Sequence, residues 1–328
     1  MNTKHRAPYN KEITFEKNLL HPKYLLTWIS LGLLFLITKL PLSFQYSIGK
    51  LIGLIFFFLN KQRKRIAVIN LNICFPQLKK SQVDLLVKEN FKNLGIGFFE
   101  MGLSWWSKEE RLENLITEYS NKGLLQDSIE NKKGILVLIK HSTHLELDLR
   151  LISTASNMGG MYRPQKNKVI NYFMRRSRNS YLTGIVSNAE ARRGIVWIKK
   201  GLKFFYAADQ DYGKKVSEFI PFFGNDAATV KLPGDLALQG ITVVFANVIR
   251  QKYGYKISLH KLKKTSSRNG FLVEMNKHYE KAISEAPEEY LWVHRRFKNV
   301  LGEKHNIYPY WESREKRRKR NRAKRLIN

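Results

Sequence analysis

Hydrophobic positions dominate the first part of the chain. Residues 24–40 read YLLTWISLGLLFLITKL and carry no charge before Lys39, a length close to the lower limit for a helix that crosses a bilayer. Basic residues flank this run and no small-residue cleavage site follows it, which argues against a removable signal peptide. We therefore predict a membrane anchor at about 24–40. A second apolar stretch at 51–59 is too short to span alone, and we expect it at the membrane interface or on the core. Two buried core helices are the alternative for both stretches.

The pattern then becomes helical and, after Gly134, alternates between strands and helices. Between residues 64 and 105, leucines and phenylalanines recur at helical spacing among lysines. Short β-like runs lie at 135–139, 202–208 and 241–249, and helical stretches lie near 167–179, 228–239 and 271–286. Such alternation is typical of an α/β fold, so we predict a mostly parallel sheet flanked by helices.

Length and composition fit one main folded domain with appendages. The chain has 328 residues, of which 43 % are hydrophobic and 12 % aromatic, so it can bury a sizeable core. Its single cysteine, Cys74, lies among apolar residues, which indicates a buried, unreactive thiol. We divide the chain into an N-terminal segment with the anchor (1–42), a main domain (43–312) and a basic tail (313–328).

Positive charge exceeds negative charge by a wide margin. Lys and Arg number 58 against 27 Asp and Glu, a formal net charge of +31, which implies anionic partners such as phospholipid, an acidic protein or nucleic acid. From residue 314 to 325 nearly every residue is basic, and we expect a solvated, disordered tail that adds affinity for anionic headgroups. Aromatic residues are not interleaved with these basic residues and an apolar anchor would be unexplained, so a nucleic-acid partner is not expected.

A polar cluster follows the first of the β-like runs, at the end of a strand where open α/β sheets build their sites. It reads HSTHLELD at 141–148. Ser142 or Thr143 is suited to cap the helix that follows, which places His141 just before that helix and Glu146 in its first turns. We expect Glu146 to hydrogen-bond the imidazole of His141, orienting it as a general base toward a hydroxyl. A metal site that includes His144, and a purely structural role, are the alternatives.

A second polar cluster follows the run at 202–208. The sequence DQDYG places Asp209 and Asp211 at the C-terminal end of that strand, so the two clusters are expected to face one crevice. A glycine-closed turn capped by an aspartate is the plain alternative. A divalent-metal site of a sugar-nucleotide transferase is a further alternative.

Arginines are concentrated between these two clusters. Arg163 stands in the sequence YRP after a short strand, and Arg175, Arg176 and Arg178 lie late in a helix. Guanidinium groups beside a carboxylate-lined crevice suit phosphate recognition, whereas a solvated basic helix face is the plain alternative. Further along the chain, we expect His294 to be a structural histidine.

Taken together, these motifs resemble the lipid A late acyltransferases, the lauroyl and myristoyl transferase family of Gram-negative bacteria. They occur in family order along nearly the whole chain. Two features depart from the family: His144 stands where an apolar or small residue is expected, and the basic tail extends beyond the usual end. The matching segments are NLNICFP (70–76), HSTHLELDLR (141–150), YRP (162–164), RRSR (175–178), AADQDYG (207–213), FIPFFGNDAAT (219–229) and APEEYLWVHRRFK (286–298).

The resemblance implies an acyltransferase of lipid A and lipopolysaccharide biosynthesis with a glycerolipid-acyltransferase-like fold. The donor it implies is an acyl carrier protein thioester, and the acceptor is a hydroxyl of a 3-hydroxyacyl chain on a Kdo-bearing lipid A precursor. No cofactor and no metal are implied. The catalytic domain would lie on the cytoplasmic face of the inner membrane, where its positive charge attracts both the acidic carrier protein and the phosphorylated acceptor.

The resemblance also implies roles for single residues. His141 and Glu146 match the catalytic pair, and Arg178 and Asp209 match the family's other functional positions. We expect four residues to bind substrate or support the site: Arg163, Arg178, Asp209 and Asp211.

Two other functions remain open at the level of sequence. One is acyl transfer by the same fold to another glycolipid or to a phospholipid. Measuring activity on each acceptor distinguishes it from transfer to a lipid A precursor. The other is a metal-dependent glycosyltransferase using Asp209 and Asp211, which would require a divalent ion.

Overall fold

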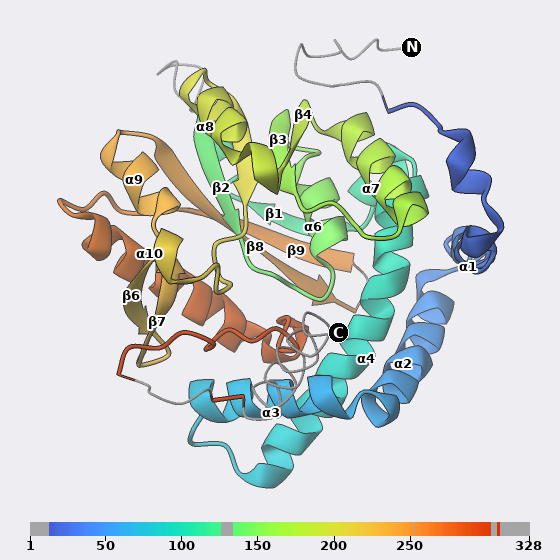
Figure 1. Cartoon of the computed structure of the whole chain (residues 1–328), viewed down its shortest axis with the longest axis horizontal. Helices are drawn as coiled ribbons and strands as arrows, with labels where there is room; N and C mark the ends of the chain where they lie inside the picture. Colours follow the sequence, from blue (N-terminus) through green and yellow to red (C-terminus); the bar gives the residue numbers. More distant parts are fainter. Residues whose placement is uncertain (1–12, 126–133, 253, 303–306, 309–328) are drawn as a thin grey trace, which may run out of the picture.

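A seven-stranded sheet forms the centre of the protein (Figure 1). The computed structural model describes residues 13–125, 134–252, 254–302 and 307–308. In spatial order the strands are β1 (Ile116–Ser120), β9 (Gly254–Lys261), β8 (Thr242–Gln251), β2 (Ile135–Ile139), β5 (Lys203–Tyr206), β3 (Met158–Tyr162) and β4 (Gly184–Ser187). Neighbouring strands are parallel except for β8 and β9, which are antiparallel. The predicted α/β fold with a mostly parallel sheet is confirmed.

The central strand β2 shows why both faces of the sheet must be covered. All five of its residues, ILVLI, are buried, and successive side chains of a strand point to opposite faces. Leu136 and Leu138 accordingly join one apolar core, whereas Ile135, Val137 and Ile139 join another. The continuous apolar run in the sequence therefore marks a strand that is enclosed on both sides, as parallel sheets require.

Helices supply the other side of each core (Figure 1). The first core receives side chains from α3 (Lys61–Cys74), α8 (Ala191–Lys199), α9 (Leu232–Leu238) and α10 (Arg268–Glu285). The second core receives them from α5 (Glu109–Glu113), α6 (Leu145–Ile152) and the end of α7 (Lys168–Tyr181). The long helix α4 (Lys80–Trp106) contributes to both cores, through Phe91 to the first and through Leu103 to the second. Cys74 is buried in the first core, as expected.

Two helical predictions need correction. The stretch predicted as helical from 64 to 105 is divided between α3 and α4, because Pro76 cannot continue a helix and restricts the residue before it. The helix predicted near 228–239 begins only at Leu232, and its first part is the strand β7 (Asn225–Val230), paired antiparallel with β6 (Ser217–Phe222). The last four residues of β7 are all buried, so the segment lacks the polar alternation that identifies a half-exposed strand.

Two apolar helices, α1 (Leu25–Ile37) and α2 (Leu42–Leu59), lie along one edge of the molecule (Figure 1). The anchor predicted at 24–40 corresponds mainly to α1, which has only 13 residues. Within the described residues, α2 is the helix whose length and composition would let it cross a membrane. The apolar stretch at 51–59 is the second half of this 18-residue helix, so the helix is longer than the sequence run indicated.

Glycines allow α2 to lie directly against α4. A Cβ on Gly53 would lie 2.2 Å from the carbonyl oxygen of Phe91, and a Cβ on Gly95 would lie 2.0 Å from the carbonyl oxygen of Gly49. Backbone atoms cannot swing aside as a flexible side chain can, so any larger residue must push the two helices apart. One side of α2 is thus fixed to the folded domain.

Replacing Gly53 by alanine should lower the melting temperature of the protein by several degrees. The added methyl group overpacks the contact with α4 at a cost of about 1–3 kcal/mol, which exceeds the gain of about 1 kcal/mol in helix propensity. Thermal unfolding in detergent, followed by circular dichroism, measures the change. Gly32→Ala in α1 is the matched control, because among the described residues no atom outside the backbone of its own helix turn lies within 4 Å of a Cβ there. Equal stability of the two variants would contradict the assigned contact.

Candidate active site

Strand register brings His141 and Asp209 together. In the parallel pair β2 and β5, Leu138 lies opposite Tyr206, and each candidate residue stands three positions beyond its strand partner. The Nδ1 of His141 lies 2.6 Å from Oδ1 of Asp209, and the backbone amide of His141 donates to Oδ2 at 2.8 Å. Asp209 therefore holds both the ring and the main chain of His141, and the prediction that the two strand ends share one site is confirmed.

The pair is arranged to present one ring nitrogen. The side chain of Asp209 has no exposed surface, whereas that of His141 is 17 % exposed. Burial alone would raise the pKa of Asp209, but the nearby His141 ring and the hydrogen bonds from His141 outweigh burial and hold this pKa below its ordinary value. An ionised Asp209 accepts a hydrogen bond from Nδ1–H of His141, which leaves the lone pair of Nε2 available to take a proton from a hydroxyl.

Glu146 does not occupy the place predicted for it. Its Oε2 accepts a hydrogen bond from Nη2 of Arg178 at 2.5 Å, its Oε1 accepts from Nε of Arg178 at 3.0 Å, and Nε1 of Trp105 donates to Oε1 at 3.3 Å. The orienting bond expected from Glu146 to His141 is corrected: the structure gives that position to Asp209. Glu146 and Arg178 instead form a bidentate ion pair that joins α6 to α7.

The two remaining predicted residues, Asp211 and Arg163, do not contact His141 in the contacts described for them. Asp211 accepts hydrogen bonds from the backbone amides of Gly213 and Asn299 and from the side-chain amide of Asn299. Asp209 and Asp211 thus serve separate partners. Arg163 is exposed, in the loop after β3. Among the described residues, no three His, Cys, Asp or Glu side chains come together as a group that could hold a metal ion.

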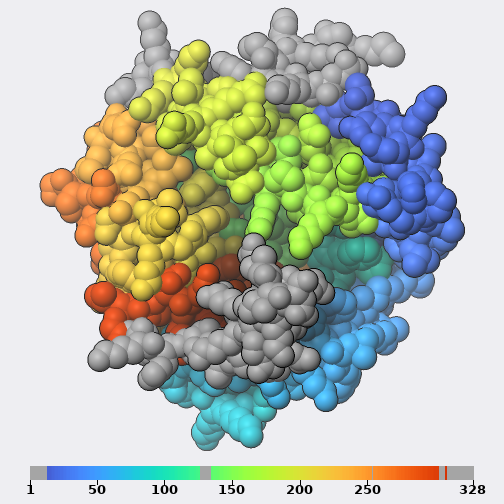
Figure 2. Space-filling model, viewed as in Figure 1, coloured from blue at the N-terminus to red at the C-terminus, as the bar shows by residue number. Residues whose placement is uncertain are grey.

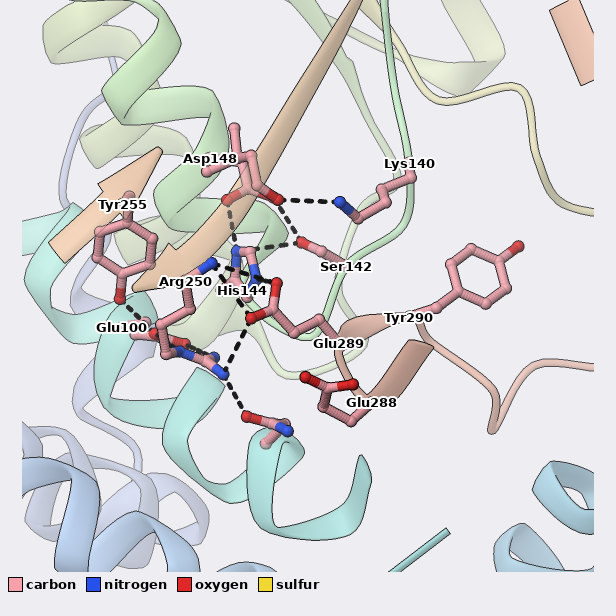
Figure 3. Close-up of polar contacts among 12 residues, drawn as sticks. Glu100, Lys140, Ser142, His144, Asp148, Arg250, Tyr255, Glu288, Glu289 and Tyr290 are labelled. Atoms are coloured by element: carbon pink, nitrogen blue, oxygen red, sulfur yellow. Dashed lines mark hydrogen bonds and ion pairs between the residues drawn. The ribbon is translucent and has the colours of Figure 1, made fainter. Parts of the chain in front are cut away.

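His144 lies in a buried charged network (Figure 3). Its Nδ1 is 2.5 Å from Oδ1 of Asp148, and its Nε2 is 2.9 Å from Oε2 of Glu289. Burial alone would lower the pKa of His144, but the charges and hydrogen bonds of the two carboxylates raise it to about 9. His144 is therefore a cation near neutral pH, with both ring nitrogens engaged, and is not free to bind a metal in this arrangement.

The same network corrects the predicted helix cap. The N-cap of α6 is His144, which makes no side-chain capping bond. Ser142 Oγ instead donates to Oδ2 of Asp148 at 2.5 Å, and no hydrogen bond from Thr143 Oγ1 is found within the described residues. The serine of the motif thus ties the turn before α6 to the buried network.

The turn that carries His141 is also held from outside the motif. The backbone amide of Thr143 donates to the carbonyl of Glu289 at 2.7 Å, and that of Leu291 donates to the carbonyl of His141 at 2.9 Å. A Cβ on Gly97 of α4 would lie only 2.0 Å from the carbonyl oxygen of Thr143. The chain around η6 (Pro287–Glu289) and the helix α4 therefore enclose the turn and fix the backbone of the candidate base.

Tyr290 and His294 lie beside the His141–Asp209 pair, and the sequence does not identify either of them as a site residue. The hydroxyl of Tyr290 donates to the carbonyl of Asp209 at 3.3 Å. Burial, followed by the electrostatic interaction with the nearby His141 ring, lowers the pKa of His294 to about 4, so this second imidazole is neutral near pH 7. Both residues belong to the segment APEEYLWVHRRFK, and its mixture of aromatic and basic residues is the one sequence feature that marks it as a candidate part of the site.

Known proteins share this sequence over most of its length. A family model described as "Bacterial lipid A biosynthesis acyltransferase" matches residues 12–299. The chain is 32 % identical over 295 residues to a lipid A biosynthesis palmitoleoyltransferase of Escherichia coli (strain K12), covering 87 % of this chain and 94 % of that protein. It is 32 % identical over 291 residues to the lipid A biosynthesis lauroyltransferase of the same strain, covering 87 % and 95 %. The corresponding myristoyltransferase is 23 % identical over 291 residues, covering 85 % and 88 %. The chain therefore belongs to the bacterial lipid A biosynthesis acyltransferase family and is an acyltransferase of lipid A biosynthesis.

Proposed function

We propose that the protein transfers a fatty acyl chain from an acyl carrier protein thioester to a hydroxyl of a 3-hydroxyacyl chain on a Kdo-bearing lipid A precursor. The observation that carries the proposal is the 2.6 Å contact between His141 Nδ1 and Asp209, at the C-terminal ends of two parallel strands. A histidine oriented in this way is suited to remove a proton from a hydroxyl. Family membership supports a lipid A-type substrate.

In the proposed reaction, Nε2 of His141 takes the proton of the acceptor hydroxyl. The oxygen attacks the thioester carbonyl, and the tetrahedral intermediate then expels the carrier's thiolate, which receives the proton from His141. Asp209 stabilises the imidazolium that forms between the two steps. The overall change is one carbon–oxygen bond formed and one carbon–sulfur bond broken, with neither oxidation nor reduction.

Glu146 and Arg178 have a supporting role in this proposal. Their bidentate pair fixes Arg178, and Trp105 joins it through Glu146. A guanidinium held in one orientation is suited to direct its remaining donors at an anionic substrate group. Arg163 and Asp211 complete the proposed set, Arg163 from its exposed loop and Asp211 by fixing the chain at Asn299.

Membrane attachment through α1 and α2 is part of the proposal. Both helices expose large apolar side chains, which are 78 % exposed at Leu26, 54 % at Phe56 and 77 % at Leu59. An apolar surface of this kind is costly in water and is typical of an interaction site. Because α2 is fixed along α4, we infer attachment on the membrane face rather than by a free spanning helix. Basic residues follow α2 directly, at 61 and 63–65, and suit anionic headgroups.

The remaining parts of the proposal concern place and partners. We place the main domain, residues 43–312, on the cytoplasmic face of the inner membrane, with no cofactor and no bound metal in the reaction. The net charge of +31 favours encounter with an acidic carrier protein and a phosphorylated acceptor, and does not require a nucleic acid. The basic tail, 313–328, and the first 12 residues of the N-terminal segment lie outside the described residues.

The test is acyl transfer from acyl carrier protein to a purified Kdo-bearing lipid A precursor, read by mass spectrometry with a chelator present. We expect a mass gain of one acyl chain with the native protein and none with His141→Ala. A folded native protein that gives no gain on this acceptor would contradict the proposed acceptor, and other glycolipids and phospholipids would be tried next. Activity that requires a divalent ion would contradict the proposed chemistry.

A further inference from the structure

A polar cavity lies between the N-terminal segment and α7, and His141 is not among the residues that line it. Its volume is about 260 Å³, and it is lined by Glu16 and, from α7, by Lys168, Asn171, Tyr172 and Arg175. The spacing of the α7 residues places them on one face of the helix, since positions three, four and seven apart share a face. The same helix carries Arg178 one turn beyond Arg175.

The cavity has the composition of an anion site. Two cations, Lys168 and Arg175, stand against one carboxylate, Glu16, which is hydrogen-bonded by the side-chain amide of Asn18 at 2.7 Å. The Nε of Arg175 is buried and has no hydrogen-bond partner among the described residues. A buried donor without an acceptor costs free energy, so turning the Arg175 side chain from the ring of Tyr162 toward an anion in the cavity would relieve that cost.

The helix α7, which lines the cavity, is in contact with the apolar helix α1. The side-chain amide of Asn167, which precedes α7, donates to Oγ1 of Thr27 in α1 at 2.8 Å, and the ring of Phe173 lies edge-on to Trp28 with 5.5 Å between centroids. Figure 2 shows the blue N-terminal segment beside the green segment that contains α7. The cavity therefore lies on the helix that packs against α1 and that carries Arg178 one turn further on.

We propose that this cavity binds a phosphate group of the anionic glycolipid acceptor while a hydroxyl of one of its acyl chains reaches His141. The assignment rests on the proposed function. A phosphate provides several acceptor oxygens for Arg175 and a negative charge for Lys168. Its place beside α1 favours a phosphate on a lipid headgroup over the phosphate of a carrier protein's prosthetic arm. Glu16 opposes the anion and keeps binding weak enough for product release.

The first arm of the test compares two acceptors, one with its full set of phosphates and one from which the recognised phosphate has been removed. Arg175→Gln should raise KM for the fully phosphorylated acceptor on the order of tenfold or more, since a charged hydrogen bond to the phosphate is lost and tenfold corresponds to about 1.4 kcal/mol. It should leave KM for the acceptor without that phosphate near the native value. Glu16→Gln should lower KM for the phosphorylated acceptor roughly two- to fivefold. Arg192→Gln is the control, because it removes the same charge from exposed surface on α8.

Some kinetic outcomes would overturn the assignment. An equal rise of KM for every acceptor, with each phosphate removed in turn, would show that Arg175 does not recognise phosphate. A rise confined to KM for the acyl carrier protein would assign the cavity to the donor. An effect of Arg192→Gln as large as that of Arg175→Gln would mean that only net charge matters.

The second arm measures binding without turnover. The phosphorylated glycolipid in detergent is titrated into the His141→Ala protein, with and without Arg175→Gln, and the dissociation constants are compared. Weaker binding on loss of Arg175, even if the native protein transfers no acyl chain, would retain the site and contradict only the proposed reaction. Equal binding by the two proteins would overturn the site. Competition by inorganic phosphate at equal potency would show a general anion site rather than one for a lipid headgroup.

Discussion

Replacing Asp209 by asparagine should reduce the rate of acyl transfer by roughly 10²- to 10⁴-fold. The side chain keeps its shape, but an amide cannot stabilise the imidazolium of His141 as a carboxylate does. The amide NH₂ can also donate to Nδ1, which places the ring proton on Nε2, where it blocks the base. The rate is measured as kcat at saturating donor and acceptor, and His141→Ala sets the floor. Thermal unfolding of each variant verifies that the loss is not one of folding.

Glu146→Gln provides the comparison that separates the two candidate orienting residues. Its carboxylate binds Arg178 and Trp105 rather than His141, so this variant should alter KM for the anionic acceptor more than it alters the pH dependence of kcat/KM. Asp209→Asn should shift that pH dependence, because it changes the immediate partner of the base. A native pH profile in Asp209→Asn together with a shifted profile in Glu146→Gln would contradict the assignment of Asp209.

The sequence pattern predicted the sheet well because buried strands leave a strong signal. The run ILVLI at 135–139 became β2 at the predicted positions, and the polar clusters after it and after β5 met at one edge. Apolar runs of this kind are determined locally, by the need to bury both faces of a strand. At 228–230 the pattern predicts helix wrongly, because the burial of these residues in β7 removes the alternation that marks a half-exposed strand.

The pairing of His141 with Asp209 depends on the register between strands β2 and β5, which cannot be read from the spacing of residues along the chain. A histidine followed five positions later by a glutamate suggested a local pair, whereas the bond to Asp209 crosses 68 positions and exists because Leu138 lies opposite Tyr206. The same limit applies to the N-terminal helices. That α2 is held against α4 follows from Gly53 and Gly95 meeting the opposite backbone, which depends on two helices distant in sequence.

His144 looked like a departure from the family motif, and the structure gives it a function within the fold. Its side chain connects Asp148 of α6 with Glu289 of η6 (Figure 3). Glu289 also accepts from the backbone amide of Arg250 in β8 at 3.1 Å, and the guanidinium of Arg250 binds Glu100 of α4 through two contacts of 2.8 Å. Four elements that surround the His141 turn therefore share one buried network of alternating charge.

Replacing His144 by alanine should destabilise the protein by about 3–5 kcal/mol near pH 6, because it leaves two buried carboxylates without their shared cation. The loss should depend on pH with a defined sign. The pKa of His144 is raised to about 9 in the folded protein, against about 6.5 in an unfolded chain. The stabilisation is therefore complete below about pH 6.5, declines by up to roughly 1.4 kcal/mol per pH unit as pH rises, and is lost above about pH 9.

Urea unfolding of the native protein and of His144→Ala at pH 6, 7.5 and 9 measures this dependence. The difference in unfolding free energy between the two proteins should be largest at pH 6 and should shrink toward pH 9. His278→Gln is the control, because burial lowers the pKa of His278 and its removal should not produce a loss concentrated at low pH. A difference that stays constant across the range would mean that His144 is neutral in the folded protein. In that case one of the two carboxylates would have to carry a proton, and His144 would contribute hydrogen bonds but no charge to the network.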